Sequence, residues 1–122
     1  MNDFVAGDLR IDVFEAVPPS PTRLFWNGKS IERDPSRLLV PFYERILKTA
    51  TDKRTPVEMH FERLEHFNSS TVSTLIQLIQ EARKRNIKLV LVFKEGLRWQ
   101  KLSFDALKVF VKDDGLLELR GR

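Results

Sequence analysis

The sequence predicts a single α/β domain with a mixed sheet of four or five strands and helices mainly on one face. Residues 89–93, Leu-Val-Leu-Val-Phe, form a continuous apolar run that is typical of a strand buried in the middle of a sheet. A helical pattern over residues 72–82 separates this run from an alternating segment at 57–62. Because a strand, a helix and a strand follow one another, we expect parallel strands with the helix packed on the sheet.

A β-hairpin is predicted at the start of the chain. Residues 9–16 show a mixed alternation of apolar and polar positions that is compatible with a strand. Pro18, Pro19 and Pro21 follow and force a turn. The aromatic-rich run 23–26 then predicts a second strand, which ends at Asn27-Gly28 because glycine readily adopts a positive φ.

The first helix is predicted to run from Asp34 to about Ala50. Asp34 suits the N-cap, and Pro35 suits the first helical position, where its missing N–H has no intrahelical partner to lose. Pro41 lies inside the pattern, and an interior proline kinks a helix, so the regular part begins either at Asp34 or only at Pro41. One face carries apolar residues at helical spacing: Leu38, Leu39, Phe42, Ile46 and Leu47.

The later segments complete the order β-β-α-β-α-β-α-β. The segment 57–62 alternates as a strand does when one face is covered and the other is wet or functional. The second helix ends near Asn86, a residue that tolerates the left-handed conformation common just past a helix. A shorter helix is predicted between Trp99 and Phe110, and a last short strand at 116–119. One domain spans residues 1–122, and we expect flexibility in residues 1–8 and 120–122.

Composition narrows the classes of protein. The chain has no cysteine, which excludes disulfides, thiol chemistry and a Cys-based zinc site. No signal peptide and no membrane-spanning run is recognisable in the sequence, so we expect a cytoplasmic protein. The net charge of +4 is a modest excess that is mixed through the chain. The basic clusters at 83–85 and 120–122 are therefore interpreted as solvated ends rather than as a nucleic-acid footprint.

Three consecutive hydroxyl residues mark the start of the second helix, in the stretch HFNSSTVSTL at 66–75. Asn68 or Ser69 is placed to be the N-cap, where a short side chain satisfies an otherwise unpaired backbone donor. The simplest interpretation is a cap with additional surface hydroxyls. The alternative is a phosphorylation site, since a phosphate in the first helical turn meets free N–H groups and the positive end of the helix dipole.

The run Leu64-Glu65-His66-Phe67-Asn68-Ser69-Ser70 stands between a predicted strand and an amphipathic helix. It resembles the Asp-Ser-Ser-Gly junction of STAS domains, the family of the anti-sigma factor antagonists. In that family a partner kinase phosphorylates the first serine of the motif, which corresponds to Ser69. Asn68 stands where most antagonists have Asp, and Thr71 stands where they have Gly.

A second set of residues is similar to a narrower branch, the SiaC-like bacterial regulatory phosphoproteins. The segment Gly28-Lys29-Ser30-Ile31-Glu32-Arg33-Asp34-Pro35, the following Pro41 and an Asn before the hydroxyl run carry this resemblance, which covers residues 24–82. The phosphorylated threonine of that branch also corresponds to Ser69. Where the branch has a later acidic stretch, this chain has a basic one at 94–101.

The resemblance implies a non-enzymatic regulatory module without a cofactor or metal, which binds partner proteins and is switched by phosphorylation. Ser69 is the expected phosphoacceptor, with Ser70 and Thr71 as fallbacks, and Asn68 is the adjacent orienting residue. The expected partner surface comprises His66 together with residues 68–71. The implied partners are a serine/threonine kinase of the anti-sigma type, a phosphatase and, further downstream, a signalling enzyme. No membrane association is expected.

Other functions fit the sequence less well. A STAS-like scaffold that is never phosphorylated, and a nucleic-acid-binding domain using the basic segments 83–88 and 98–101, remain the alternatives. His66 and Ser69 as a base and a nucleophile lack a third residue and any oxyanion-hole signal. His60 and His66 lack the further ligands that a metal site needs. Trp99 is interpreted as a core residue, with a role as a protein-contact anchor as the alternative.

Overall fold

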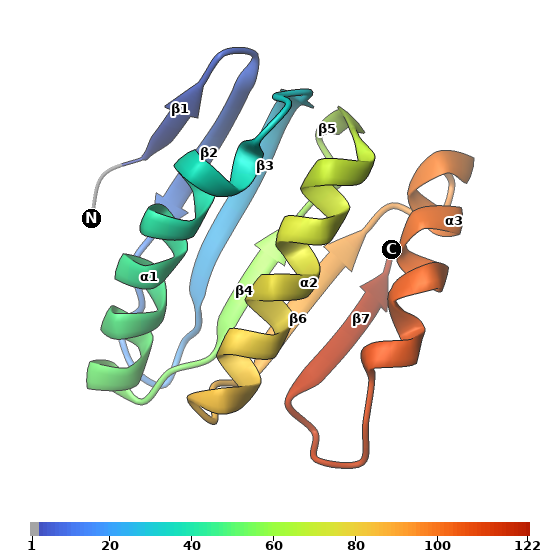
Figure 1. The fold of residues 1–122 in the computed structure, drawn as a ribbon. Helices are drawn as coiled ribbons and strands as arrows, with labels where there is room; N and C mark the ends of the chain where they lie inside the picture. The colour runs from blue at the N-terminus through green and yellow to red at the C-terminus, as the bar shows by residue number, and fades with distance from the viewer. Residues whose placement is uncertain (1–2) are drawn as a thin grey trace.

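The computed structural model describes residues 3–122, which form one seven-stranded sheet and three α-helices with a short 3₁₀ helix (Figure 1). The strands follow the spatial order β1-β2-β3-β4-β6-β7, and β5 pairs with β3 outside this path. The elements, in chain order, are β1 (Phe4–Ala6), β2 (Leu9–Phe14), β3 (Thr22–Ser30), α1 (Pro35–Lys53), β4 (Val57–His60), β5 (Leu64–Phe67), α2 (Ser69–Lys84), β6 (Leu89–Phe93), α3 (Arg98–Ala106), the 3₁₀ helix η1 (Leu107–Phe110) and β7 (Leu117–Gly121).

The sheet is mixed, as predicted. The strands β1, β2 and β3 pair antiparallel, whereas β3, β4, β6 and β7 pair parallel. The strand count is larger than four or five because β1 and β5 were not predicted. Both strands have only three or four residues, too few for a period of two to stand out. Strand pairing extends into both end segments, since β1 begins at Phe4 and β7 ends at Gly121.

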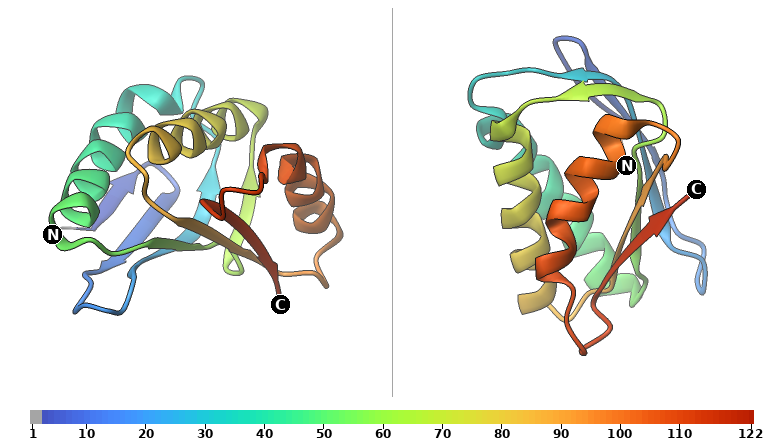
Figure 2. Two further views of the ribbon diagram at one scale, coloured as in Figure 1. Left: turned by 90° about the horizontal axis from the view of Figure 1, so that it is seen from below. Right: turned by 90° about the vertical axis from the view of Figure 1, so that its right-hand side faces the viewer.

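All three α-helices lie on one face of the sheet (Figure 2, left). Side chains alternate between this face and the opposite one along each strand. Those on the helix side form the core, for example Leu24, Met59 and Leu91, which are fully buried. No helix of residues 3–122 covers the opposite face. The same part of the chain contains no helix long and apolar enough to span a bilayer.

Helix α1 begins at Pro35 and continues through Pro41. Proline at position 41 cannot donate a hydrogen bond to the carbonyl of Arg37 one turn earlier. Because Pro41 lies on the exposed side of the helix, water can satisfy that carbonyl, and the helix tolerates the interruption. Apolar residues of the opposite side, including Phe42 and Ile46, pack into the core.

The end of α2 agrees with the prediction from the sequence. Arg85 is the C-cap, and Asn86 follows with a φ of 58°. This left-handed conformation costs asparagine less than most residues, and it lets the N–H of Ile87 reach the carbonyl of Ala82 at 2.9 Å. The chain then enters the buried strand β6 directly.

Candidate functional site

The two strands β3 and β5, which pair with each other, fix the position of the start of α2. Strand β5 pairs parallel with the last part of β3, so that His66 lies opposite Lys29 and Phe67 opposite Ser30. The N–H of Asn68 then donates to the carbonyl of Ser30 at 3.0 Å. The first turn of α2 therefore begins at the carboxyl ends of two paired strands, with little freedom to move relative to the sheet.

Asn68 is the N-cap of α2, one of the two residues predicted for this role. Its Oδ1 accepts hydrogen bonds from the backbone N–H of Thr71 at 2.9 Å and from the hydroxyl of Thr71 at 2.8 Å. Its Nδ2 donates to the carbonyl of Glu32 at 2.8 Å. A carboxylate at this position can accept but cannot donate, so asparagine supplies a tie to residue 32 that the aspartate of the STAS motif lacks.

Two substitutions of Asn68 separate its role as the N-cap from its hydrogen bond to Glu32. In Asn68→Ala both the cap and the bond to Glu32 are lost, and we expect the free energy of unfolding to fall by about 1–2 kcal/mol. Asn68→Asp keeps the cap and gains a favourable interaction with the helix dipole, so its loss should be smaller. Urea denaturation of the two variants measures which of them loses more free energy of unfolding. An aspartate variant as unstable as the alanine variant would contradict the assignment of the cap to Oδ1.

Thr71 is not accessible in this structure. Its side chain is 0% exposed, and its hydroxyl lies 2.6 Å from the hydroxyl of Ser30. The same hydroxyl lies 3.3 Å from the carbonyl of Ser30. Thr71 thus joins the helix to β3, and a phosphate there would require the first turn of α2 to open. This geometry disfavours Thr71 as a fallback phosphoacceptor.

Ser69 is exposed and is the first residue of α2, while Ser70 is half-buried. Helix geometry leaves the N–H groups of the first turn without intrahelical acceptors, apart from those that the cap satisfies. Asn68 bonds the N–H of Thr71, so those of Ser69 and Ser70 remain available to an anion. The side chain that can carry a phosphate most easily is therefore also the one nearest to unsatisfied donors.

The surface around His66, three residues before Ser69, is aromatic and basic. His66 is exposed, with its ring centroid 6.1 Å from that of Trp99. Trp99 is half-buried and packs edge-to-face on Phe67 at 5.2 Å, so it joins the periphery of the core rather than its centre. Arg98 and Lys101 of the same helix are exposed. A half-buried tryptophan rimmed by polar groups is a common anchor in protein interfaces.

The two histidines do not share a site. His66 lies beside Trp99 of α3, while His60 is buried on the sheet face that no helix of residues 3–122 covers. Both ring nitrogens of His60 contact carboxylates, those of Glu58 and Glu62. The described residues hold no cluster of three or more His, Asp or Glu side chains placed to bind a metal ion. The alternation at 57–62 had indicated a wet or functional face, but not that Glu58 and His60 would be buried.

Comparisons with known proteins agree with this architecture. The family model of the STAS domain matches residues 41–95. A protein of the DUF3478 family from Shewanella loihica PV-4, with a SpoIIAA-like fold, superposes with a TM-score of 0.58 at 13% identity, covering 100% of this chain and 90% of that one. The anti-sigma factor antagonist SpoIIAA in its unphosphorylated form superposes with a TM-score of 0.53 at 18% identity, covering 78% of this chain and 81% of that one. No curated protein matches the sequence.

One of these matches rests on the sequence, and the other two rest on backbone geometry. The sequence match contains most of α1, all of β4, β5 and α2, and strand β6, which are the elements that hold the candidate site. The resemblance to the SiaC-like branch is not tested by them and stays a prediction. The chain thus has a SpoIIAA-like fold, and its central part, residues 41–95, matches the family model of the STAS domain.

Proposed function

We propose that this protein is a non-enzymatic regulatory module, similar to an anti-sigma factor antagonist, that binds a partner protein through the start of α2 and is switched by phosphorylation of Ser69. One observation supports this most strongly. In a SpoIIAA-like fold, Ser69 is the exposed hydroxyl at the first position of a capped helix, in the segment whose sequence resembles the Asp-Ser-Ser-Gly motif of STAS domains. The binding surface comprises Ser69, Ser70 and His66, with Trp99 as an apolar anchor beside them.

Phosphorylation at Ser69 adds a charge of roughly −1.5 to −2 at neutral pH. This charge lowers the free energy of unfolding only slightly, because the side chain is exposed, the helix dipole is favourable and Asn68 places no carboxylate next to it. For a bound partner the same charge is costly unless an arginine or lysine receives it, since the contact surface must lose its water. The kinase supplies ATP and the catalytic groups, and a phosphatase reverses the step.

The test is affinity purification from the cells that make the protein, with wild type, Ser69→Ala and Ser69→Asp as baits. Ser73 provides the matched control, because it is exposed on the same helix one turn further on. We expect Ser69→Asp to capture a different set of proteins from Ser69→Ala, while the Ser73→Ala and Ser73→Asp baits capture what wild type does. Identical sets from the two Ser69 baits would favour the scaffold that is never phosphorylated.

Ion pairing weakens the nucleic-acid alternative. In the segment 83–88, Arg83 pairs with Asp114, Arg85 with Glu44 and Glu81, and Lys88 with Glu118. Guanidinium and ammonium groups that are held by carboxylates are not free to replace counterions along a phosphate backbone.

One of these pairs makes a prediction about pH. The hydrogen bond from the Arg83 guanidinium lowers the pKa of the Asp114 carboxyl below its usual value. A group with a lowered folded-state pKa stabilises the fold above its unfolded value, about 3.9, and this contribution is lost as the pH falls through the folded pKa. We therefore expect Asp114→Asn to be less stable than wild type at pH 7 and the difference to shrink below about pH 4. Thermal unfolding across this range measures it, and a difference that stays constant with pH would contradict the pairing.

A further inference from the structure

A second candidate site lies away from the start of α2, on the sheet face that carries no helix in the described part of the chain. Glu58 and His60 of β4 point to this face, since the neighbouring Met59 belongs to the core on the other side. Although no helix covers them, Glu58 is only 8% exposed and His60 only 6%. Arginine side chains and Phe25, whose ring stacks on that of His60 at 4.5 Å, fold over them instead.

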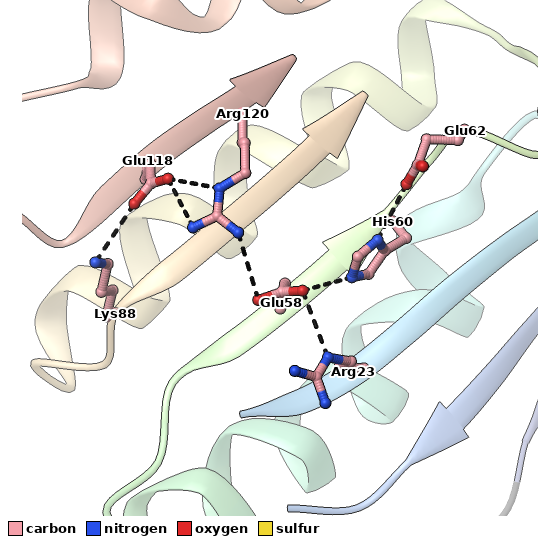
Figure 3. Close-up of polar contacts among 7 residues, drawn as sticks. All are labelled: Arg23, Glu58, His60, Glu62, Lys88, Glu118 and Arg120. Carbon is pink, nitrogen blue, oxygen red and sulfur yellow. Dashed lines mark hydrogen bonds and ion pairs between the residues drawn. The ribbon is translucent and has the colours of Figure 1, made fainter. Parts of the chain in front are cut away.

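A chain of polar and charged contacts on this face connects β4 with its neighbour β3 and, across β6, with β7 (Figure 3). Glu58 contacts His60 Nε2 at 2.6 Å, Arg23 Nε of β3 at 3.5 Å and Arg120 Nη1 of β7 at 3.9 Å. Arg120 also pairs with Glu118 at 2.8 Å. Because Glu58 contacts guanidinium groups from two other strands, it orients both of them around a single point.

His60 extends this network to a second carboxylate. Its Nδ1 lies 3.0 Å from Glu62, while its Nε2 lies 2.6 Å from Glu58. His60 therefore joins the two carboxylates on this face of the sheet.

A cleft of about 390 Å³ opens above this cluster. Its lining includes Arg23 and Arg120, whose side chains are 44% and 40% exposed, and also Arg63 and Arg122. Within residues 3–122, the side chains of Arg63 and Arg122 have no ion-pair or hydrogen-bond partner. Four guanidinium groups thus face one cleft that contains two carboxylates, and two of the four are uncommitted.

Stability alone does not account for such a cluster. Burying an ion pair costs desolvation that its Coulomb attraction often fails to repay, and apolar residues on these strands would pack at least as well. Buried charged groups that adjoin an open cleft are instead frequent at binding sites. The excess of arginine indicates that the ligand is an anion. The volume of the cleft lies within the usual range of small-molecule pockets, which indicates a small molecule.

The geometry points to a binding site for a phosphate-bearing small molecule in this cleft. Arg63 and Arg122 would bind the phosphate directly, and the network of Glu58, His60 and Arg23 would hold the floor and the remaining guanidinium groups in place. Phosphate fits better than carboxylate because it offers three terminal oxygens and nearly two charges to several converging forks. This site is separate from Ser69 and does not depend on the proposed phosphorylation.

The test is a titration of the ¹⁵N-labelled protein at constant ionic strength, with inorganic phosphate, adenosine monophosphate and malonate as probes. The double variant Arg63→Gln/Arg122→Gln removes the two uncommitted guanidiniums, and Lys84→Gln/Lys112→Gln removes the same charge from exposed positions elsewhere. We expect saturable shifts in residues 58–63 and 118–122, at least about tenfold weaker binding in the arginine variant and unchanged binding in the lysine variant.

The probes also separate the two sources of phosphate. Tighter binding of adenosine monophosphate than of inorganic phosphate would assign the cleft to an organic phosphate, and equal binding would assign it to the free ion. The proposal is overturned if neither phosphate probe saturates in the millimolar range, if the lysine variant loses as much affinity as the arginine variant, or if malonate binds as tightly as phosphate.

Discussion

Replacing Gln100 with leucine is expected to lower the free energy of unfolding by about 3 kcal/mol, a large effect for a residue outside the apolar core. Gln100 of α3 is completely buried. Its Nε2 donates to the carbonyls of Phe61 at 2.7 Å and Leu64 at 3.1 Å, and its Oε1 accepts from the N–H of Lys94 at 2.8 Å. Leucine fills a similar volume but cannot make these hydrogen bonds. A buried backbone group that is left without a hydrogen-bond partner costs about 1–3 kcal/mol.

The position of these bonds links the prediction to the candidate site. Residues 61 to 63 form the turn between β4 and β5, and β5, which begins at Leu64, leads directly into Asn68 and α2. Urea denaturation measures the loss, with Gln80→Leu as the control because Gln80 is exposed on α2. We expect the control to stay within about 0.5 kcal/mol of wild type. A Gln100→Leu variant as stable as wild type would mean that the turn does not depend on this side chain.

Installing phosphoserine at position 69 is expected to change the affinity for the partner about a hundredfold, which corresponds to about 2.7 kcal/mol. The free energy of unfolding should change by less than about 0.5 kcal/mol, because the phosphate lies at an exposed helix start with unsatisfied N–H groups. A phosphorylation switch requires a large change in the affinity for the partner and a small change in the free energy of unfolding. A modification that weakened the fold as much as the complex would be a lesion rather than a switch.

Isothermal titration with a partner captured by the wild-type bait measures the affinity, and urea denaturation of the same sample measures the fold. Phosphoserine at position 73 serves as the control, since it places the same charge on the same helix one turn further from the N-terminus. We expect the control to alter the affinity much less. Equal effects at both positions would show that charge anywhere on α2 suffices, and the assignment to Ser69 would be wrong.

The fold was largely predictable because its main signals are local and periodic. The apolar run of β6, the amphipathic stripe of α2 and the capping residue Asn68 depend on neighbours in sequence, and the structure confirms all three. The strands β1 and β5 were missed because three or four residues carry too little periodicity, and their pairing comes from distant segments. In the same way, the burial of Thr71 depends on Ser30, which is 41 residues away.

The charged face illustrates a different limit. Alternation placed Glu58, His60 and Glu62 on one side of a strand, and charged residues in such a pattern normally indicate solvent. In the structure, Glu58 and His60 are buried because Arg23 and Arg120 arrive from two other strands and cover them. Sequence spacing within one strand gives the face that a side chain occupies, but the partners across a parallel sheet depend on a strand order that only the fold reveals.

The central claim is that Ser69 carries the regulatory phosphate, and phosphopeptide mapping tests it most directly. The protein is purified from its own cells in several growth states with phosphatases inhibited, and the segment containing residues 69–71 is fragmented in the mass spectrometer. The account predicts phosphate on Ser69 in at least one state, and none on the buried Thr71. The absence of phosphate from all three residues in every state, or its presence on Thr71 alone, would contradict the account.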